Sequence, residues 1–241
     1  MNMNSALTCA FGLTQSHLSL INKDFSLVQS SDEQGIAVHR DVVEPLQAMR
    51  NEAKKAGFNL SIASAFRDFT RQLSIFNRKA QGQLAVRDSQ NQVIDIDQLS
   101  KTELLWAILH FSALPGASRH HWGTDFDFYD PSLLPAGKSL ALEPWEYQPG
   151  GYFYSLNQWL DEHCEQFGFY RPYAKYNGGV AHEPWHFSHF RTAEQYQVLI
   201  TLEHLTEQIA NSDISLKAEI MDNIDIIFHQ YIHNIAEPPY V

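Results

Sequence analysis

The stretch Ser118-Arg119-His120-His121-Trp122-Gly123-Thr124-Asp125-Phe126-Asp127, with Glu183-Pro184-Trp185-His186 downstream, decides what fold and chemistry this chain is expected to have. The two segments supply histidines and carboxylates at short spacings. Two histidines and one carboxylate can hold one zinc ion and leave its fourth position open for water. A glutamate three residues before the last histidine can act as the base on that water. Together the segments suggest a zinc hydrolase.

The first segment also predicts a loop that enters a strand. Gly123 permits the tight backbone path that such an entry needs, and residues 124–129 alternate polar and aromatic side chains as a strand does. Successive side chains of a strand point to opposite faces, so Asp125 and Asp127 share one face. Either carboxylate could therefore reach a metal on spacing alone. Because His186 lies in a second strand-like segment, residues 185–190, we expect the site to be assembled across a sheet.

Length, composition and charge narrow the class of protein. The chain has 241 residues, which fits one large domain or one domain with an appendage, and 44% of them are hydrophobic, enough for a packed core. Its 17 basic and 28 acidic residues give a net charge of −11. We expect no binding to nucleic acid or to an anionic membrane surface, because such partners attract basic proteins. The acidic charge is equally compatible with solubility alone.

The sequence lacks the signals of membrane insertion and of disulfide stabilisation. No run approaches the roughly 18 apolar residues of a membrane span, and residues 1–20 lack the basic and apolar parts of a secretory signal. This absence of a signal predicts a cytoplasmic location, with the periplasm or cell wall as the alternative. Cys9 and Cys164 are too few for a disulfide framework. Metal ligands are therefore sought among histidines and carboxylates.

Hydrophobic spacing predicts a mixture of helices and strands without regular alternation. Helices are expected at about 42–57, 69–80, 100–109, 155–168 and 193–210, and again after residue 215. β-like segments are expected at 60–64, 93–96, 124–129 and 185–190. Ser100 and Glu103 form a capping box for one helix, and Ser155 is expected to cap another. This pattern favours an α+β fold with an antiparallel sheet.

Three motifs carry a resemblance to a known family. Ser-x-His-x-x-Gly-x-x-x-Asp at 118–127, followed by Glu-x-Trp-His at 183–186, resembles the signature of the D-alanyl-D-alanine carboxypeptidase family of zinc peptidases. This group includes vancomycin-resistance D,D-dipeptidases and L,D-carboxypeptidases, and it shares its fold with the hedgehog signalling domain. The third motif, Ser-x-x-Arg-x-x-x-x-Gln, matches residues 64–72. The resemblance covers roughly residues 40–190 and implies a central antiparallel sheet flanked by helices, here with additional C-terminal helices.

The resemblance also implies a role for each matched residue. The zinc ligands that it implies are His120, Asp127 and His186. Glu183 would be the general base and then the general acid, and Arg67 would stabilise the oxyanion of the tetrahedral intermediate. Ser118 and Gln72 would help to hold the C-terminal end of the substrate. Zinc lowers the pKa of bound water from about 15.7 towards about 7, which provides a nucleophile at neutral pH.

This chain departs from the family pattern at three positions. Asp125 stands where the family usually has alanine, and it is either an ordinary exposed or hydrogen-bonded strand residue, a contact behind the metal ligands, or a partner for a substrate ammonium group. Phe66 replaces a tyrosine and Asp68 replaces a serine. These changes bear on the substrate and leave the metal site intact.

The sequence thus predicts a zinc-dependent carboxypeptidase that acts on D-Ala-containing peptides, either peptidoglycan stem peptides or D-Ala-D-Ala. The alternatives are a peptidoglycan cross-bridge endopeptidase and a non-catalytic, zinc-stabilised binding module, although a binding module has no need of Glu183 or Arg67. Residues 1–192 would form the catalytic domain. Residues 193–241 would form a helical extension packed on it, or else a dimerisation element. The oligomeric state does not follow from the sequence.

Overall fold

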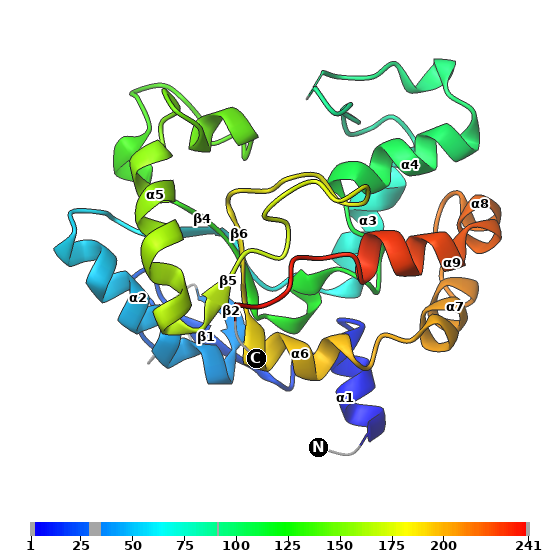
Figure 1. Ribbon diagram of the computed structural model, residues 1–241. Coiled ribbons are helices and arrows are strands. Elements are labelled where there is room, and N and C mark those ends of the chain that lie inside the picture. Colours follow the sequence, from blue (N-terminus) through cyan, green and yellow to red (C-terminus); the bar gives the residue numbers. More distant parts are fainter. Residues whose placement is uncertain (1–2, 29–34, 91, 240–241) are drawn as a thin grey trace.

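A computed structural model describes residues 3–28, 35–90 and 92–239 of the chain (Figure 1). Its helices are α1 (Met3–Ala10), α2 (Val43–Lys55), α3 (Phe69–Ala80), α4 (Lys101–Phe111), α5 (Tyr154–His163), α6 (Phe190–Gln197), α7 (Leu202–Ala210), α8 (Lys217–Asp222) and α9 (Ile224–Ile227). Its strands are β1 (Leu18–Ile21), β2 (Ile36–His39), β3 (Ser61–Ser64), β4 (Asp125–Tyr129), β5 (Phe169–Tyr170) and β6 (His186–His189). Helices and antiparallel sheets are mixed, which confirms the predicted α+β class.

The larger sheet is antiparallel, with strand order β3-β4-β6-β5, and β1 and β2 form a separate antiparallel pair. The central pair, β4 and β6, joins two segments that are far apart in the chain. Its register places Asp125 opposite Ser188, Phe126 opposite Phe187 and Asp127 opposite His186. Because side chains alternate along each strand, this register puts Asp125, Asp127, His186 and Ser188 on one face and the phenylalanines on the other.

The phenylalanine face of the sheet is buried against α2 and α5, which cover one side of the sheet in Figure 1. Phe126, Phe128 and Phe187 are fully buried there. Burying a side chain of this size contributes about 1.5–3 kcal/mol, so this face anchors the sheet. The opposite, polar face of β4 and β6 is left to form a site.

A second hydrophobic core lies between α3, α4 and the C-terminal helices, on the other side of the molecule in Figure 1. Helices α7, α8 and α9 contribute the fully buried Leu205, Ile209, Ile220 and Ile227 to it. Helix α6 runs across position 192, where the sequence predicts the end of the catalytic domain. That boundary stays a prediction.

Several local predictions are confirmed and others are wrong. Ser100 caps α4 in a complete capping box with Glu103, as expected. Ser155 lies inside α5, which begins after Phe153 without a side-chain cap. The β-like segment at 93–96 forms a single bridge at Val93 and then a turn of 3-10 helix, because the Asp95 side chain accepts a hydrogen bond from the backbone of Asp97.

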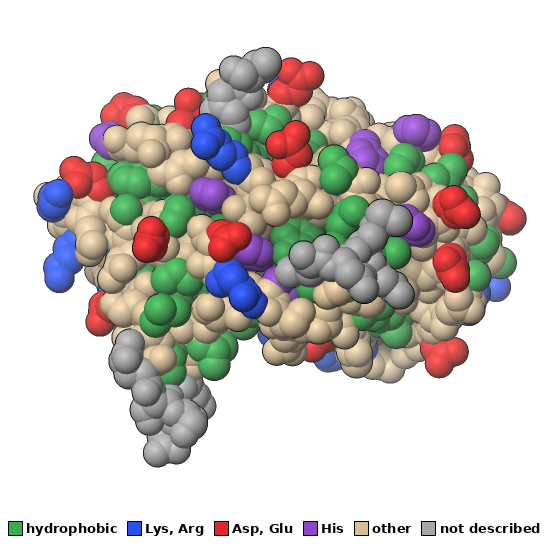
Figure 2. Space-filling view, turned by 90° about the horizontal axis from the view of Figure 1, so that it is seen from below, with side chains coloured by type: hydrophobic (Ala, Val, Ile, Leu, Met, Phe, Trp, Pro, Cys, Tyr) green, Lys and Arg blue, Asp and Glu red, His purple; other side chains and the backbone are tan. Residues whose placement is uncertain are grey.

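Within the described ranges, no helix is long and apolar enough to cross a membrane. On the face shown in Figure 2, acidic and basic side chains are scattered among apolar ones rather than gathered into one charged patch.

Candidate active site

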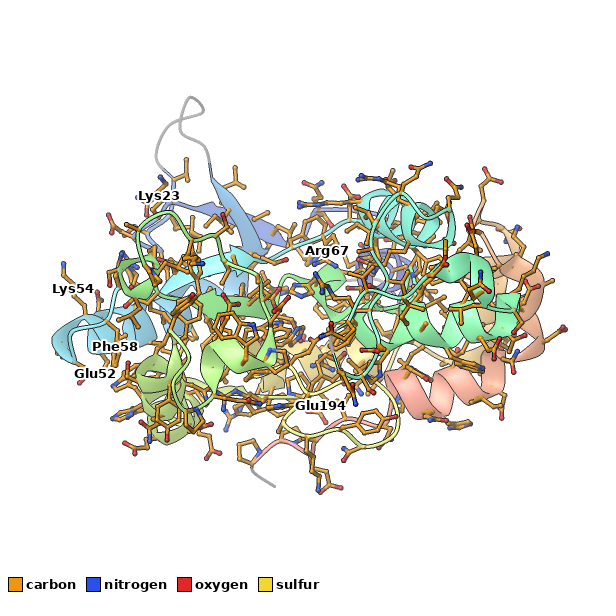
Figure 3. The ribbon with its side chains drawn as sticks, turned by 90° about the horizontal axis from the view of Figure 1, so that it is seen from above. Lys23, Glu52, Lys54, Phe58, Arg67 and Glu194 are labelled. Carbon is orange, nitrogen blue, oxygen red and sulfur yellow. The ribbon has the colours of Figure 1, made fainter. Side chains whose placement is uncertain are left out.

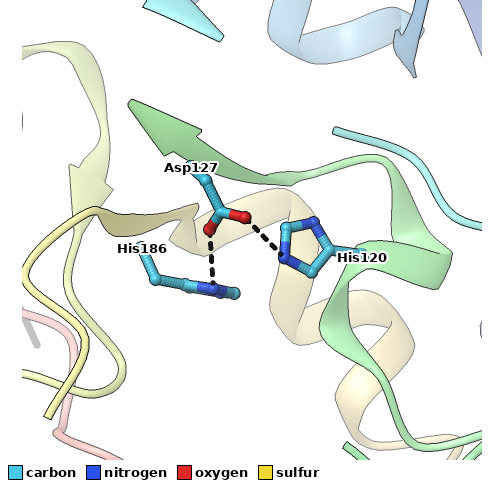
Figure 4. Close-up of side chains that lie close together, drawn as sticks. All are labelled: His120, Asp127 and His186. Carbon is cyan, nitrogen blue, oxygen red and sulfur yellow. Dashed lines mark ion pairs between the residues drawn. The ribbon is translucent and has the colours of Figure 1, made fainter. Parts of the chain in front are cut away.

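The polar face of the central strands brings together the three side chains that the sequence predicts as metal ligands. His120, Asp127 and His186 are buried, and one ligand atom from each lies within 4.8 Å of the others (Figure 4). His120 Nε2 lies 3.6 Å from Asp127 Oδ2, and His186 Nδ1 lies 3.3 Å from Asp127 Oδ1. This arrangement can hold a metal ion.

The backbone before β4 sets the position of His120. Residues Arg119–Trp122 form a 3-10 turn that ends at Gly123, whose φ is +68°. A Cβ atom on Gly123 would lie only 2.8 Å from the backbone nitrogen of His39. Glycine is therefore required for conformation and for space, as the expected loop-to-strand entry implies.

Each histidine is oriented by a hydrogen bond on the side away from Asp127. His120 Nδ1 donates to the carbonyl of Ala65 at 2.9 Å, and His186 Nε2 donates to Asp125 Oδ1 at 3.0 Å. A neutral imidazole with one nitrogen protonated has its lone pair on the other. His120 Nε2 and His186 Nδ1 are therefore the free acceptors, and both face Asp127.

The charges at this point favour a cation. Asp127 Oδ1 is buried without a hydrogen bond among the described residues. Asp125, Asp127 and Glu183 all lie within 3.4 Å of a ring nitrogen of His186. Burial alone would lower the pKa of His186, but these three carboxylates raise it well above its usual value. A group of two nitrogens and a carboxylate with this excess of negative charge fits a divalent metal such as zinc.

Burial also shifts the pKa values of His120 and Glu183. It lowers the pKa of His120 to about 3, which keeps the ring neutral and able to bind a metal. It raises the pKa of Glu183, whose Oε2 lies 3.4 Å from His186 Nδ1. A carboxylate with a raised pKa, next to the metal position, is suited to accept and return a proton.

Arg67 lies just before α3 and reaches the same cleft. It is labelled in Figure 3, between the half of the molecule that carries α2 and the half that carries α4. Its Nη1 donates to Gln72 Oε1 at 2.7 Å and its Nη2 to Ser64 Oγ at 3.1 Å. Its backbone nitrogen donates to the carbonyl of His120 at 3.0 Å, which ties it to the metal centre.

The two residues predicted to hold the substrate differ in placement. Ser118 lines the cleft, immediately before the 3-10 turn that carries His120. Gln72 is fully buried, and its Nε2 donates to the carbonyl of Ala113 at 2.7 Å while its Oε1 accepts from Arg67. Gln72 thus supports Arg67 from behind, and its direct contact with substrate stays a prediction.

One cleft contains most of these groups. Besides Arg67, Ser118 and Glu183, its walls include the aromatic residues Phe111, Tyr173 and Trp185. Two further lining residues, Arg87 and Glu143, approach to 3.8 Å and link the loops that follow α3 and β4. The stretch 131–152, which follows β4, thus borders the site through Glu143.

Sequence reasoning missed two parts of the site. Lys79 donates to Ser112 Oγ at 2.6 Å, and Ser112 lines the cleft. The signal was the seven-residue spacing from Gln72, which places both side chains on one face of a helix. Sequence reasoning also assigned no role to Arg119, which forms an ion pair with Asp125 at 2.7 Å.

Asp125 is fully buried and does not line the cleft. Of the three roles considered for it, the structure therefore favours a hydrogen-bonded contact behind His186 over a contact with a substrate ammonium group.

The sequence of this chain is similar to those of known proteins. The family model for VanY, D-alanyl-D-alanine carboxypeptidase, matches residues 35–192. An uncharacterised protein of Haemophilus influenzae is 40% identical over 121 residues, which cover 49% of this chain and 92% of that protein.

Two solved structures are also similar. VanYB in complex with D-alanine-D-alanine is 21% identical, with a TM-score of 0.48 over 78% of this chain and 90% of that one. A vancomycin-resistance D,D-pentapeptidase VanY in complex with Zn(II) is 19% identical, with a TM-score of 0.47 over 87% of this chain and 99% of that one. Since the family model matches well over half of its length, the chain belongs to the VanY family of D-alanyl-D-alanine carboxypeptidases and is a metallopeptidase.

Proposed function

We propose that this protein is a zinc-dependent carboxypeptidase that removes a C-terminal D-Ala from peptidoglycan stem peptides or cleaves D-Ala-D-Ala. The observation that carries the proposal is the convergence of His120, Asp127 and His186 in the same cleft as Glu183 and Arg67. A metal held only for structure needs neither a buried base nor a buried guanidinium beside it. This is the reason to prefer an enzyme to a zinc-stabilised binding module.

His120, Asp127 and His186 would hold the zinc ion, which would supply a nucleophile by lowering the pKa of bound water towards about 7. Glu183 accepts the proton and then delivers it to the leaving amine, a role that its raised pKa favours. Arg67 donates to the oxygen that becomes negative in the tetrahedral intermediate. Its guanidinium stays charged throughout, because arginine does not deprotonate in proteins.

Two buried cations, Arg67 in the wall of the cleft and Lys79 behind the lining residue Ser112, favour a substrate with a free C-terminal carboxylate. Arg67 and Lys79 are largely buried, and burial lowers the pKa of each. Among the described residues, neither has a carboxylate within the 4 Å of an ion pair; they donate instead to Gln72, Ser64 and Ser112. A buried charge without an opposite charge is unfavourable, and a substrate carboxylate would relieve it. A cross-bridge bond whose leaving amine has no neighbouring carboxylate would gain nothing from these cations.

The test is hydrolysis of D-Ala-D-Ala and of tetrapeptide and pentapeptide stems by zinc-loaded protein, with C-terminally amidated peptides and Glu183→Gln in parallel. We expect cleavage of the free acids, much weaker cleavage of the amides, and a loss of cleavage in the variant while zinc stays bound. Equal cleavage of acids, amides and cross-linked dimers would indicate the endopeptidase. Zinc binding without cleavage of any peptide would indicate the binding module.

A further inference from the structure

We propose that Asp125 is a positioning residue that orients His186 for the metal, and that Arg119 makes this possible by balancing the charge of Asp125. The inference rests on the proposed metal site and adds two residues to it. Neither residue touches a reacting atom. Both act through the imidazole of His186.

The carboxylate of Asp125 accepts four hydrogen bonds, two on each oxygen. Its Oδ1 accepts from His186 Nε2 at 3.0 Å and from Arg119 Nε at 2.7 Å. Its Oδ2 accepts from Thr124 Oγ1 at 2.7 Å and from Ser188 Oγ at 3.0 Å. Asp125 is fully buried, so these four donors replace water completely and leave the carboxylate one orientation.

This fixed acceptor decides which nitrogen of His186 carries the proton. An Nε2 proton that donates to Asp125 leaves the lone pair on Nδ1, the atom that faces Asp127 and Glu183. The ring is also held edge to face by Tyr173, with ring centroids 4.9 Å apart. A metal-binding histidine whose other nitrogen donates to a carboxylate is fixed in tautomer and orientation and is a stronger donor to the metal.

Arg119 offsets the negative charge that Asp125 brings. Its guanidinium is buried, lies over the ring of Trp122 at 4.6 Å, and donates to Gln197 and Ser188 as well as to Asp125. His186 therefore gains a carboxylate acceptor without a further net negative charge beside the metal. The metal keeps the positive charge that it needs to activate water.

The same strand pairing builds the network and the metal site. Asp125 is paired with Ser188, and two residues along each strand Asp127 is paired with His186. Arg119 reaches Asp125 across the Gly123 turn. The orientation of His186 and the position of Asp127 therefore depend on one register.

The test compares zinc affinity, measured by competition with a coloured chelator, in four proteins: wild type, Asp125→Asn, Asp125→Ala and the double variant Arg119→Met with Asp125→Ala. Removing both members of a buried ion pair is often neutral for stability, whereas removing one leaves a buried charge. The double variant therefore separates metal affinity from folding. We expect it to bind zinc about 10–100-fold more weakly than wild type. Asp125→Asn, which keeps an oxygen acceptor, should lie between the two.

Two further measurements make the result specific. The visible spectrum of the Co²⁺-substituted double variant should differ from that of wild type, because the spectrum reports ligand geometry. Asp130→Ala is the matched control, because Asp130 is also a fully buried carboxylate. Asp130 accepts hydrogen bonds from the backbone nitrogens of Asn59 and Ser132. This control variant should lose stability and keep the zinc affinity and Co²⁺ spectrum of wild type.

A folded double variant or Asp125→Asn variant with unchanged zinc affinity and an unchanged spectrum would overturn the inference. If the wild type cleaved no peptide but the variants still bound zinc more weakly than it does, the result would support this inference and contradict the proposed function. A wild-type protein that takes up no metal would overturn both.

Discussion

Arg67 is held from three directions by hydrogen bonds within the protein. Ser64 and Gln72 accept from its two terminal nitrogens, and the carbonyl of His120 accepts from its backbone nitrogen. The motif Ser-x-x-Arg-x-x-x-x-Gln thereby acquires a physical meaning, because its serine and glutamine are the acceptors that fix its arginine. A donor that is already in place needs no reorganisation when negative charge develops.

Replacing Arg67 tests this interpretation. We expect Arg67→Met to lower kcat by about 10²–10³-fold, the usual effect of losing one donor to an oxyanion, with zinc affinity unchanged. Gln72→Met should have a smaller effect in the same direction, since it loosens Arg67 without removing it. Steady-state kinetics with a stem peptide, together with zinc titration, measure both. If Gln72→Met raised KM and left kcat unchanged, Gln72 would bind substrate directly, as the sequence predicts.

At the scale of elements, the C-terminal segment supports the loop that carries Glu183. The backbone nitrogen of Ala236 donates to Pro172 at 2.8 Å, and the side chain of Asn234 donates to the carbonyl of Asn177 at 2.7 Å. Both acceptors lie in the stretch between β5 and β6 that contains Glu183. Part of the predicted extension is therefore in direct contact with the loop that carries Glu183.

Gly179 lies in the same loop, directly against the backbone of Gln230 near the C-terminus, and gives a second prediction. A Cβ atom at Gly179 would overlap the carbonyl oxygen of Gln230, so Gly179→Ala must displace the loop or the C-terminal segment. We expect a lower kcat with zinc still bound. Gly57→Ala is the control, because Gly57 has a φ of +92° with open space around it and lies outside the cleft, so this variant loses stability alone. An equal fall in kcat in both variants would show that general destabilisation is the cause.

The same scale shows how far the sequence could predict the structure. Alternating polar and aromatic residues predicted β4 and β6 well, because one face of each strand packs on a helical layer. The segment at 93–96 has similar apolar spacing but only one bridging partner, so its own side-chain hydrogen bonds determine its shape. The predicted metal ligands and Glu183 come from local motifs, and the structure brings them together. The ion pair of Arg119 with Asp125 depends on tertiary packing, which no local pattern encodes. Helical spacing places Lys79 on the face of Gln72, but it does not indicate the contact with Ser112.

At the scale of the whole molecule, we expect two buried histidines to make the stability of the fold sensitive to acid. Burial lowers the pKa of His17 and of His189 to about 4, below the ~6.5 of an unfolded histidine. The unfolded chain then binds more protons than the folded one between pH 6.5 and 4, so stability is complete above this window and falls as pH drops through it. Urea unfolding of His17→Phe at pH 7.5 and pH 5 should show a pH difference about 1–2 kcal/mol smaller than in wild type. His229→Gln, at an exposed position, should keep the wild-type difference.

Removal of the metal should weaken the whole fold. The three predicted ligands come from the turn before β4 and from β4 and β6, so bound zinc would select the folded chain and would stabilise it by mass action. At a free zinc concentration 100 times Kd this amounts to about 2.7 kcal/mol, which corresponds to roughly 5–10 °C in Tm for a protein of this size. Thermal unfolding with and without a chelator measures the shift. In His186→Ala the chelator should have little effect; a shift as large as that of wild type would place the metal elsewhere.

The pairing of Asp127 with His186 has a consequence for the order of events in folding. The two residues are opposite each other in the ladder of β4 and β6 but distant in the chain, so the segment between them must close into a loop before the strands meet. A slip of one residue in this ladder would turn His186 towards the phenylalanine layer. We therefore expect a refolding chain to bind metal only after the central strands have paired in the correct register. The rate of metal binding during refolding would then report the rate at which β4 and β6 pair.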